Sequence, residues 1–155
     1  MNLQDIQEQY LGEWTGTNLL RLSWLTPSEF HSDGRLSVAA LGNNKFLTFR
    51  YTWSHENTAH EGFLLLAYDA KQAVAAASWV DSWHQSAGIL NCLGTIDAAG
   101  VIDVRGSYPA PPDPDWGWRI VITANEADAL QITMYNVTPA GEEDLAVQAT
   151  YTRTR

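Results

Sequence analysis

The sequence predicts one all-β domain, an antiparallel up-and-down β-barrel of about ten strands preceded by a short N-terminal helix. Three observations predict it. Runs rich in β-branched and aromatic residues recur roughly every 8–12 residues along the chain. Turn residues such as Gly42-Asn43-Asn44 and Asp97-Ala98-Ala99-Gly100 separate these runs. No connection is long enough for a crossover helix, so neighbouring strands are expected to be antiparallel.

The helix is expected at the start of the chain, where Leu3, Ile6 and Tyr10 recur at helical spacing. The strands that follow are each bounded by turn residues. Their expected ranges are Glu13–Trp24, Arg35–Leu41, Lys45–Ser54, His60–Tyr68, Ala73–Asp81, Ser86–Ile96, Val101–Gly106, Gly117–Thr123, Leu130–Val137 and Asp144–Arg153. Because a closed meander leaves no strand edge exposed, we expect a barrel rather than an open sheet.

Three of the connections carry specific expectations. Ser32-Asp33-Gly34 and Asn125-Glu126-Ala127-Asp128 are expected to be turns. The segment Pro109–Pro114 holds four of the six prolines and is expected to form a stiff, extended loop.

Residues along several strands alternate between two faces of the sheet. Leu130, Ile132 and Met134, for example, lie on one face, and the residues between them lie on the other. Two other strands are apolar on both faces, at Phe46–Phe49 and Phe63–Leu66. An outer helix or the second copy of a homodimer would cover such a wall. Both alternatives stay open from the sequence.

Composition narrows the class of protein. The 155 residues fit a single domain over 1–155, and 45% hydrophobic residues supply a core. A formal charge of −9 disfavours binding to nucleic acid or to an anionic membrane surface. Apolar runs are too short to cross a bilayer, and Met1–Asp5 lacks the features of a signal peptide. Because Cys92 is the only cysteine, no disulfide forms within the chain, and we expect a cytoplasmic protein.

The segment Gly12-Glu13-Trp14 resembles the opening motif of lipocalins and other calycins. That resemblance implies a tryptophan that plugs one end of the barrel, with an arginine of the last strand packed across it. Arg153 stands where that arginine is needed. A guanidinium stacked on an indole gains roughly 0.5–2 kcal/mol, so the pair would stabilise the closed end.

The chain as a whole is similar to a bacterial family of lipocalin-like proteins that is catalogued only as a domain of unknown function. The similarity rests on short motifs in a shared order. They are Leu11-Gly12-Glu13-Trp14, Glu61-Gly62, Tyr68-Asp69, Trp79-Val80-Asp81-Ser82, Trp118-Arg119, Met134-Tyr135, Pro139-x-Gly141-Glu142 and Tyr151-Thr152-Arg153. The family implies the fold and brings no established activity.

Two other barrel families are less similar. Haem-binding barrels of the nitrobindin kind use a late histidine, and no histidine follows His84, so no haem is expected. Fatty-acid-binding barrels carry Arg-x-Tyr on the last strand. This chain has the reverse order, Tyr151-x-Arg153, so that carboxylate anchor does not transfer.

The candidate ligand-binding residues are Trp79, Asp81, Trp83, Arg119 and Tyr135. Trp79, Asp81 and Trp83 alternate along one strand face, which would place an acid between two indoles. A buried carboxylate needs a partner, and Arg119 interrupts an apolar strand where it could supply one. A purely structural pair is equally compatible with the sequence. Arg50 and Tyr51 are further interior candidates, of which alternation allows only one inside.

Other combinations of polar residues give little evidence for a metal site or a catalytic site. His55 and His60 flank a hairpin and could touch across it. A zinc site needs three or four converging ligands and a fourth is not visible, so a solvated loop is favoured and no metal is expected. Asp81, Ser82 and His84 do not make a nucleophilic triad, because Ser82 and His84 would lie about 7 Å apart along one strand.

Two classes of function follow. The first is an intracellular binding protein that holds a small apolar or aromatic molecule in the barrel and needs no cofactor. Arg119 leaves open whether that molecule is anionic. The second is a small-molecule enzyme, an isomerase or hydrolase, that uses Asp81 as a base with Arg119 or Tyr135. A barrel whose interior is completely filled by its own side chains would exclude both classes of function. The binding function is favoured because no catalytic set satisfies the geometry.

Overall fold

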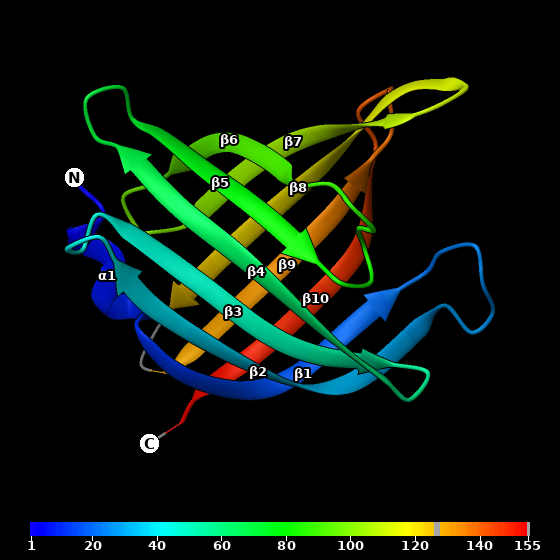
Figure 1. Cartoon of the computed structure of the whole chain (residues 1–155), viewed down its shortest axis with the longest axis horizontal. Coiled ribbons are helices and arrows are strands. Elements are labelled where there is room, and N and C mark those ends of the chain that lie inside the picture. The colour runs from blue at the N-terminus through cyan, green and yellow to red at the C-terminus, as the bar shows by residue number, and fades with distance from the viewer. Residues whose placement is uncertain (126–127, 155) are drawn as a thin grey trace.

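A computed structural model describes residues 1–125 and 128–154 and shows a closed antiparallel barrel (Figure 1). The helix and strands follow one another along the chain without a crossover. Their bounds are α1 Gln4–Tyr10, β1 Gly12–Arg21, β2 Glu29–Leu41, β3 Phe46–His55, β4 Thr58–Asp69, β5 Val74–Asp81, β6 Leu90–Ile96, β7 Ile102–Ala110, β8 Asp113–Asn125, β9 Ala129–Val137 and β10 Glu143–Arg153. The expected ten-stranded barrel with a short N-terminal helix is confirmed.

Each strand pairs with its neighbours in sequence, and β1 also pairs with β10 to close the barrel. The connections therefore alternate between two ends. At one end lie α1 and both termini, on the left of Figure 1. At the other end, which we call the mouth, lie the β1–β2, β3–β4, β5–β6, β7–β8 and β9–β10 connections.

Several turns form where the residue types predict them. Gly42, Asn43 and Asn44 have φ of 64°, 60° and 66°, and Glu56-Asn57 at the β3–β4 hairpin have φ of 50° and 63°. Two consecutive residues with positive φ make the two-residue turn whose twist matches that of antiparallel strands. The mouth is therefore built on one side by a tight hairpin.

The expected turn at Ser32-Asp33-Gly34 is wrong, because these residues lie inside β2. Gly34 pairs with Gly16 of β1, and Gly16 also pairs with Tyr151 of β10. A Cβ on Gly16 would lie 1.8 Å from the Thr150 carbonyl oxygen, so the strands approach too closely there for a side chain. Gly34 itself lies inside a strand rather than in a turn, and a Cβ on it would lie 3.2 Å from the Thr52 carbonyl oxygen, a tight contact.

The expected proline loop is also wrong in its extent. Strands β7 and β8 continue to Ala110 and from Asp113, so the proline segment is a long hairpin that projects from the mouth (Figure 1). A register shift between Tyr108 and Ala110 accommodates the proline. The strand expected from Ser86 begins only at Leu90, which leaves an eight-residue segment, 82–89, between β5 and β6. The turn expected at Asn125–Asp128 includes residues 126–127, outside the described part.

The end of the barrel opposite the mouth is closed as the resemblance implied. Trp14 is 1% exposed, and its indole Nε1 donates to the Tyr10 carbonyl at 2.9 Å. The Arg153 guanidinium lies 4.2 Å from the centre of the Trp14 ring and donates to the Gln9 and Leu11 carbonyls. Tyr10 in turn donates to the carbonyls of Gly100 and Ile122. Helix α1 is thereby tied to the barrel floor.

Buried side chains from the strands form one core inside the barrel. Among the described residues, a small space lies between Asn18, Tyr51, Met134 and Tyr151. The volume open to the centre of a water-sized sphere is about 10 Å³ there, which is the least that one water molecule needs. That space is therefore too small for a ligand larger than water. Among the described residues, no helix is long and apolar enough to cross a membrane.

Candidate functional site

Aromatic side chains gather at the mouth, and we call Trp53, Trp79, Trp83, His84 and Trp118 the mouth cluster. Trp79 and Trp118 stack with ring centres 5.3 Å apart and planes 11° apart. The His84 ring lies 5.5 Å from Trp79 and 5.3 Å from Trp118. Strands β3, β5 and β8 and the segment 82–89 supply these rings, so residues distant in sequence meet in one apolar wall.

Asp81, the last residue of β5, lies beside the mouth cluster and is 3% exposed. Its Oδ2 accepts hydrogen bonds from the Tyr51 hydroxyl at 2.6 Å and from Trp53 Nε1 at 3.1 Å. Its Oδ1 accepts the backbone N–H groups of Trp83 at 2.8 Å and His84 at 3.2 Å. Four donors thus stabilise a buried carboxylate that forms no ion pair within the described part of the chain. The same bonds anchor the start of segment 82–89.

Tyr51 links this carboxylate to the mouth cluster. Trp79 Nε1 donates to the Tyr51 hydroxyl oxygen at 2.9 Å, while the Tyr51 hydroxyl donates to Asp81. Burial, and then the charge of Asp81, raises the pKa of Tyr51 well above its usual value, so the hydroxyl stays a donor. Of the two interior candidates, Tyr51 faces inward and Arg50 faces outward, where its guanidinium lies 5.7 Å from the Phe63 ring.

Gly62 of β4 makes the Tyr51–Asp81 contact possible. In register it lies between these two residues, paired with Tyr51 of β3 on one side and Asp81 of β5 on the other. A Cβ at Gly62 would lie 2.1 Å from the Tyr51 Cζ atom. The ring therefore crosses the strand where there is no side chain, which is one reason for glycine inside a strand.

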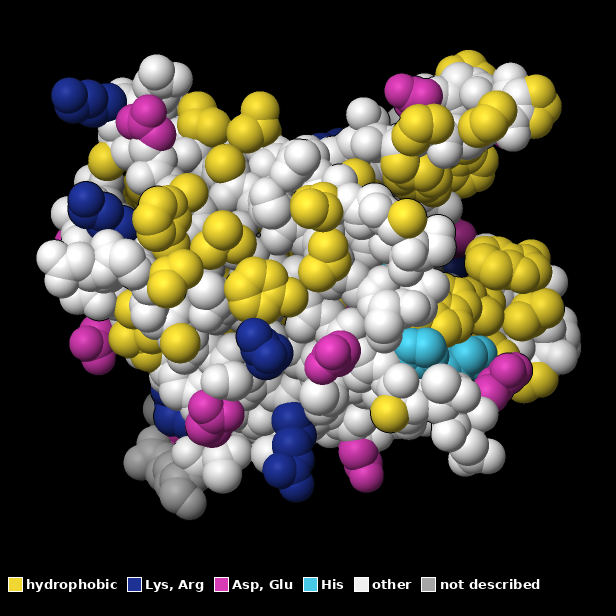
Figure 2. All heavy atoms as spheres, in the orientation of Figure 1, with side chains coloured by type: hydrophobic (Ala, Val, Ile, Leu, Met, Phe, Trp, Pro, Cys, Tyr) yellow, Lys and Arg dark blue, Asp and Glu magenta, His cyan; other side chains and the backbone are white. Residues whose placement is uncertain are grey.

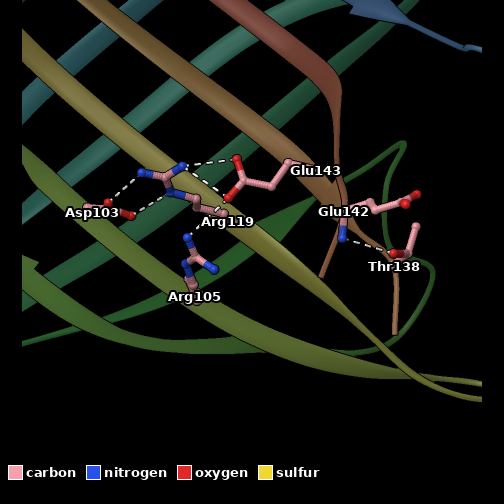
Figure 3. Close-up of polar contacts among 6 residues, drawn as sticks. All are labelled: Asp103, Arg105, Arg119, Thr138, Glu142 and Glu143. Atoms are coloured by element: carbon pink, nitrogen blue, oxygen red, sulfur yellow. Dashed lines mark hydrogen bonds and ion pairs between the residues drawn. The ribbon is translucent and has the colours of Figure 1, made fainter. Parts of the chain in front are cut away.

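The expected pairing of Asp81 with Arg119 is wrong. Arg119 lies on the outer face of β8, where it donates to Asp103 at 2.7 and 2.9 Å and to Glu143 at 3.0 Å (Figure 3). Arg105 joins the same network by donating to Glu143 at 3.1 Å. Hydrogen bonds from Arg119 lower the pKa of Asp103. Arg119 lies in an otherwise apolar strand because two acidic side chains, Asp103 and Glu143, lie beside it on the outer face of the barrel.

Tyr135 lies on the same outer face, with its ring 5.6 Å from the Arg119 guanidinium. Of the five candidate residues, the structure therefore brings together Trp79, Asp81 and Trp83 and separates Arg119 and Tyr135 from them. An enzyme that uses Asp81 with Arg119 or Tyr135 is not assembled, since the wall of the barrel lies between them. Both oxygens of Asp81 are, moreover, already occupied.

His55 and His60 belong to the mouth rather than to a solvated loop, contrary to expectation. The His55 side chain is 10% exposed and packs against Phe30 and Trp83, with ring centres 4.9 and 5.8 Å apart. His60 packs on Trp53 at 5.0 Å, and its Nδ1 lies 3.0 Å from the Ser82 hydroxyl. No group of three metal-ligating side chains converges among the described residues.

His84 is buried among indoles, and this burial lowers its pKa from 6.5 to about 4, against the smaller opposing effect of the Asp81 charge. In the unfolded chain the imidazole would bind a proton between these two pH values, and in the folded chain it would not. We therefore expect the free energy of unfolding to fall as the pH drops from about 6.5 towards 4. Urea unfolding at several pH values should show a shallower fall for His84→Gln. The variant His31→Gln, at an exposed histidine, should keep the full slope, and an unchanged slope in His84→Gln would contradict the assignment.

The mouth also contains polar atoms without partners. Trp116 Nε1, Trp118 Nε1 and Gln85 Oε1 are buried, and none has a hydrogen-bond partner among the described residues. Next to the mouth, segment 82–89 borders a groove of about 470 Å³ on the outer wall, lined partly by Arg50, Ser82 and Ile89. Figure 2 shows the molecule hollowed on the right, between the β7–β8 hairpin and the β1–β2 connection, with apolar side chains around the hollow.

A closed antiparallel barrel whose floor is a tryptophan under an arginine, with an aromatic mouth opposite, is a lipocalin-like barrel. The chain belongs to the family described as protein of unknown function (DUF1579), whose model matches residues 4–153. No curated protein matches the sequence.

Two solved structures share the fold. Rv2717c from M. tuberculosis is 16% identical with a TM-score of 0.68, covering 100% of this chain and 99% of that chain. The S-type phycobiliprotein lyase CPES from Guillardia theta is 12% identical with a TM-score of 0.64, covering 100% of this chain and 94% of that chain. These likenesses show the shape of the barrel.

Proposed function

We propose that this chain is a binding protein that holds one small, flat and largely apolar molecule at the mouth of its barrel. The observation that carries the proposal is the mouth cluster, in which five aromatic rings meet. Apolar and aromatic walls with a few fixed polar groups are typical of small-molecule sites. One of the solved structures that share this fold is a phycobiliprotein lyase, and this likeness is compatible with a small-molecule site in the present barrel.

Three of the sequence candidates serve this proposal. Trp79 and Trp83 supply wall area, and Asp81 holds the segment that carries Trp83 and His84 by accepting their backbone N–H groups. Arg119 and Tyr135 have no part in it, because they face outward. A cytoplasmic location and a homodimer remain predictions. The dimer would form on the outer face of β4–β6, where Val80 and Leu93 are 37% and 65% exposed and apolar side chains are spread over the surface (Figure 2).

The proposal predicts saturable binding of methylnaphthalene, one molecule per chain, measured by equilibrium dialysis. Trp83→Ala removes a wall ring and leaves the Asp81 anchor, which uses only the Trp83 backbone. We expect it to weaken binding about tenfold, equivalent to about 1.4 kcal/mol. Trp24→Ala is the matched control, because Trp24 is 72% exposed. Absence of saturable binding, or equal losses in the two variants, would contradict the proposal.

A further inference from the structure

Ser82, the first residue after β5, forms a hydrogen-bonded pair with a histidine of the neighbouring strand. Its hydroxyl oxygen lies 3.0 Å from Nδ1 of His60 on β4, a distance at which a nucleophile exchanges a proton with its base. The same oxygen accepts the backbone N–H of Glu61 at 3.0 Å. A hydroxyl can donate once and accept twice. When Nδ1 of His60 carries no proton, the hydroxyl therefore donates to it, and one lone pair of the oxygen stays free for attack.

The imidazole of His60 is held in place by a third side chain. It packs on the Trp53 ring, with ring centres 5.0 Å apart and planes 33° apart. The Trp53 indole donates to Asp81 at 3.1 Å, so the ring beside His60 is itself fixed. A hydroxyl next to a base that a further group orients is the arrangement that activates a serine. It differs from the triad excluded on the sequence, because the histidine comes from the next strand and not from the same one.

Ser82 can be reached by a substrate. It is exposed and lines the groove of about 470 Å³ on the outer wall, a volume in the range of small-molecule sites. The exposed charges in this lining are one base, Arg50, and one acid, Glu61, so no net exposed charge favours a charged substrate. Three apolar side chains line the same groove: Phe63, Val80 and Ile89. The groove is therefore suited to a small, uncharged and partly apolar molecule.

The groove also contains donors for the negative charge that develops when a hydroxyl adds to a carbonyl group. Ala87 and Gly88 of segment 82–89 line it together with Ser82. Within the described part of the chain, the backbone N–H groups of Ala87 and Gly88 donate to no protein acceptor. Backbone N–H groups are a common source of stabilisation for such an oxyanion. One short segment thus supplies both the hydroxyl and free donors.

We propose that Ser82 and His60 hydrolyse esters of small, uncharged apolar acids in this groove, an activity separate from binding at the mouth. The Ser82 oxygen forms a bond to the ester carbonyl carbon, and its proton passes to Nδ1 of His60. The bond from that carbon to the alcohol oxygen breaks, and the alcohol leaves with the proton. Water then adds to the acyl carbon and gives a proton to His60. The carboxylic acid is released, and the proton returns to the Ser82 oxygen.

Hydrolysis of 4-nitrophenyl acetate, followed by the absorbance of nitrophenolate, tests the proposal. We expect saturable hydrolysis above the rate in buffer. Ser82→Ala and His60→Gln should each lower the rate by about tenfold or more, because a general base alone typically contributes about 10²–10⁴-fold. Ser107→Ala and His31→Gln are the matched controls, at an exposed serine and an exposed histidine outside the groove, and should keep the rate.

A fluorophosphonate probe gives a readout on the unaltered chain, so it does not depend on the folding of any variant. The activated serine displaces fluoride at phosphorus, and peptide mass spectrometry should locate the single label on Ser82. A label on another residue, or no label, would overturn the proposal. A rate of hydrolysis unchanged in Ser82→Ala or in His60→Gln, or no hydrolysis at all, would overturn it as well. Each of these outcomes leaves the proposed function standing, because binding of methylnaphthalene is measured separately.

Discussion

Trp14→Ala is expected to lower the free energy of unfolding by about 3–5 kcal/mol, the usual cost of removing a large buried aromatic side chain. Trp14 is among the largest fully buried side chains and is 1% exposed. Its loss would leave a cavity at the barrel floor and would also remove the ring over which the Arg153 guanidinium lies. The Tyr10 carbonyl would lose its indole donor, so the attachment of α1 would weaken too.

Urea denaturation followed by far-ultraviolet circular dichroism would measure this loss. Trp24→Ala is the control, because it removes the same side chain from a position 72% exposed and should change stability by less than about 0.5 kcal/mol. If Trp14→Ala were as mild as Trp24→Ala, the floor would not depend on the indole. The role that the sequence motif implied for Trp14 would then be wrong.

Gly62→Ala is expected to cost at least about 2 kcal/mol, more than most single methyl additions, because the new methyl group collides with Tyr51. A Cβ there would lie 2.1 Å from Cζ and 2.2 Å from the hydroxyl oxygen of Tyr51. The ring would have to move, and its hydrogen bonds with Asp81 and Trp79 would break. The buried carboxylate would lose a strong donor.

Gly88→Ala is the matched control for this variant, since a Cβ at Gly88 meets nothing within 4 Å and its substitution should be close to neutral. A double-mutant cycle sharpens the test. In a Tyr51→Ala background the collision is gone, so Gly62→Ala should cost much less than it does alone. Additive losses would show that Gly62 acts through something other than Tyr51.

The barrel itself could be predicted from the sequence because its determinants are local. Strand alternation at Leu130–Met134 and the turn residues at Gly42–Asn44 depend on backbone preferences of neighbouring residues, and both are found as expected. The floor was predictable through the resemblance of Gly12-x-Trp14 to the calycin opening motif, which implies that an arginine of the last strand packs on the tryptophan. Errors arose where a turn residue served another purpose, as at Gly34, which allows close approach of strands.

The candidate site was predictable only in part. Trp79 and Asp81 share a face because they are two residues apart on β5, which alternation alone requires. Trp53 was not among the candidates, and His84 was considered only for a triad that strand geometry excludes. Trp53 nevertheless donates to Asp81 through its indole, and His84 through its backbone. A glycine inside an otherwise bulky strand, Gly62, was the one local sign that a large side chain crosses there.

What the sequence by itself determined was the order of the strands and the closed meander, because these follow from short-range backbone and side-chain patterns, whereas the tryptophan floor followed from the resemblance to the calycin opening motif. The tertiary structure alone decided which face of each strand turns inward. Alternation divides a strand into two sets and does not say which set is buried, so Arg119 could have faced Asp81 and instead faces Asp103 and Glu143. The partners of a buried carboxylate come from other strands, and only closure of the barrel brings Tyr51 and Trp53 to it.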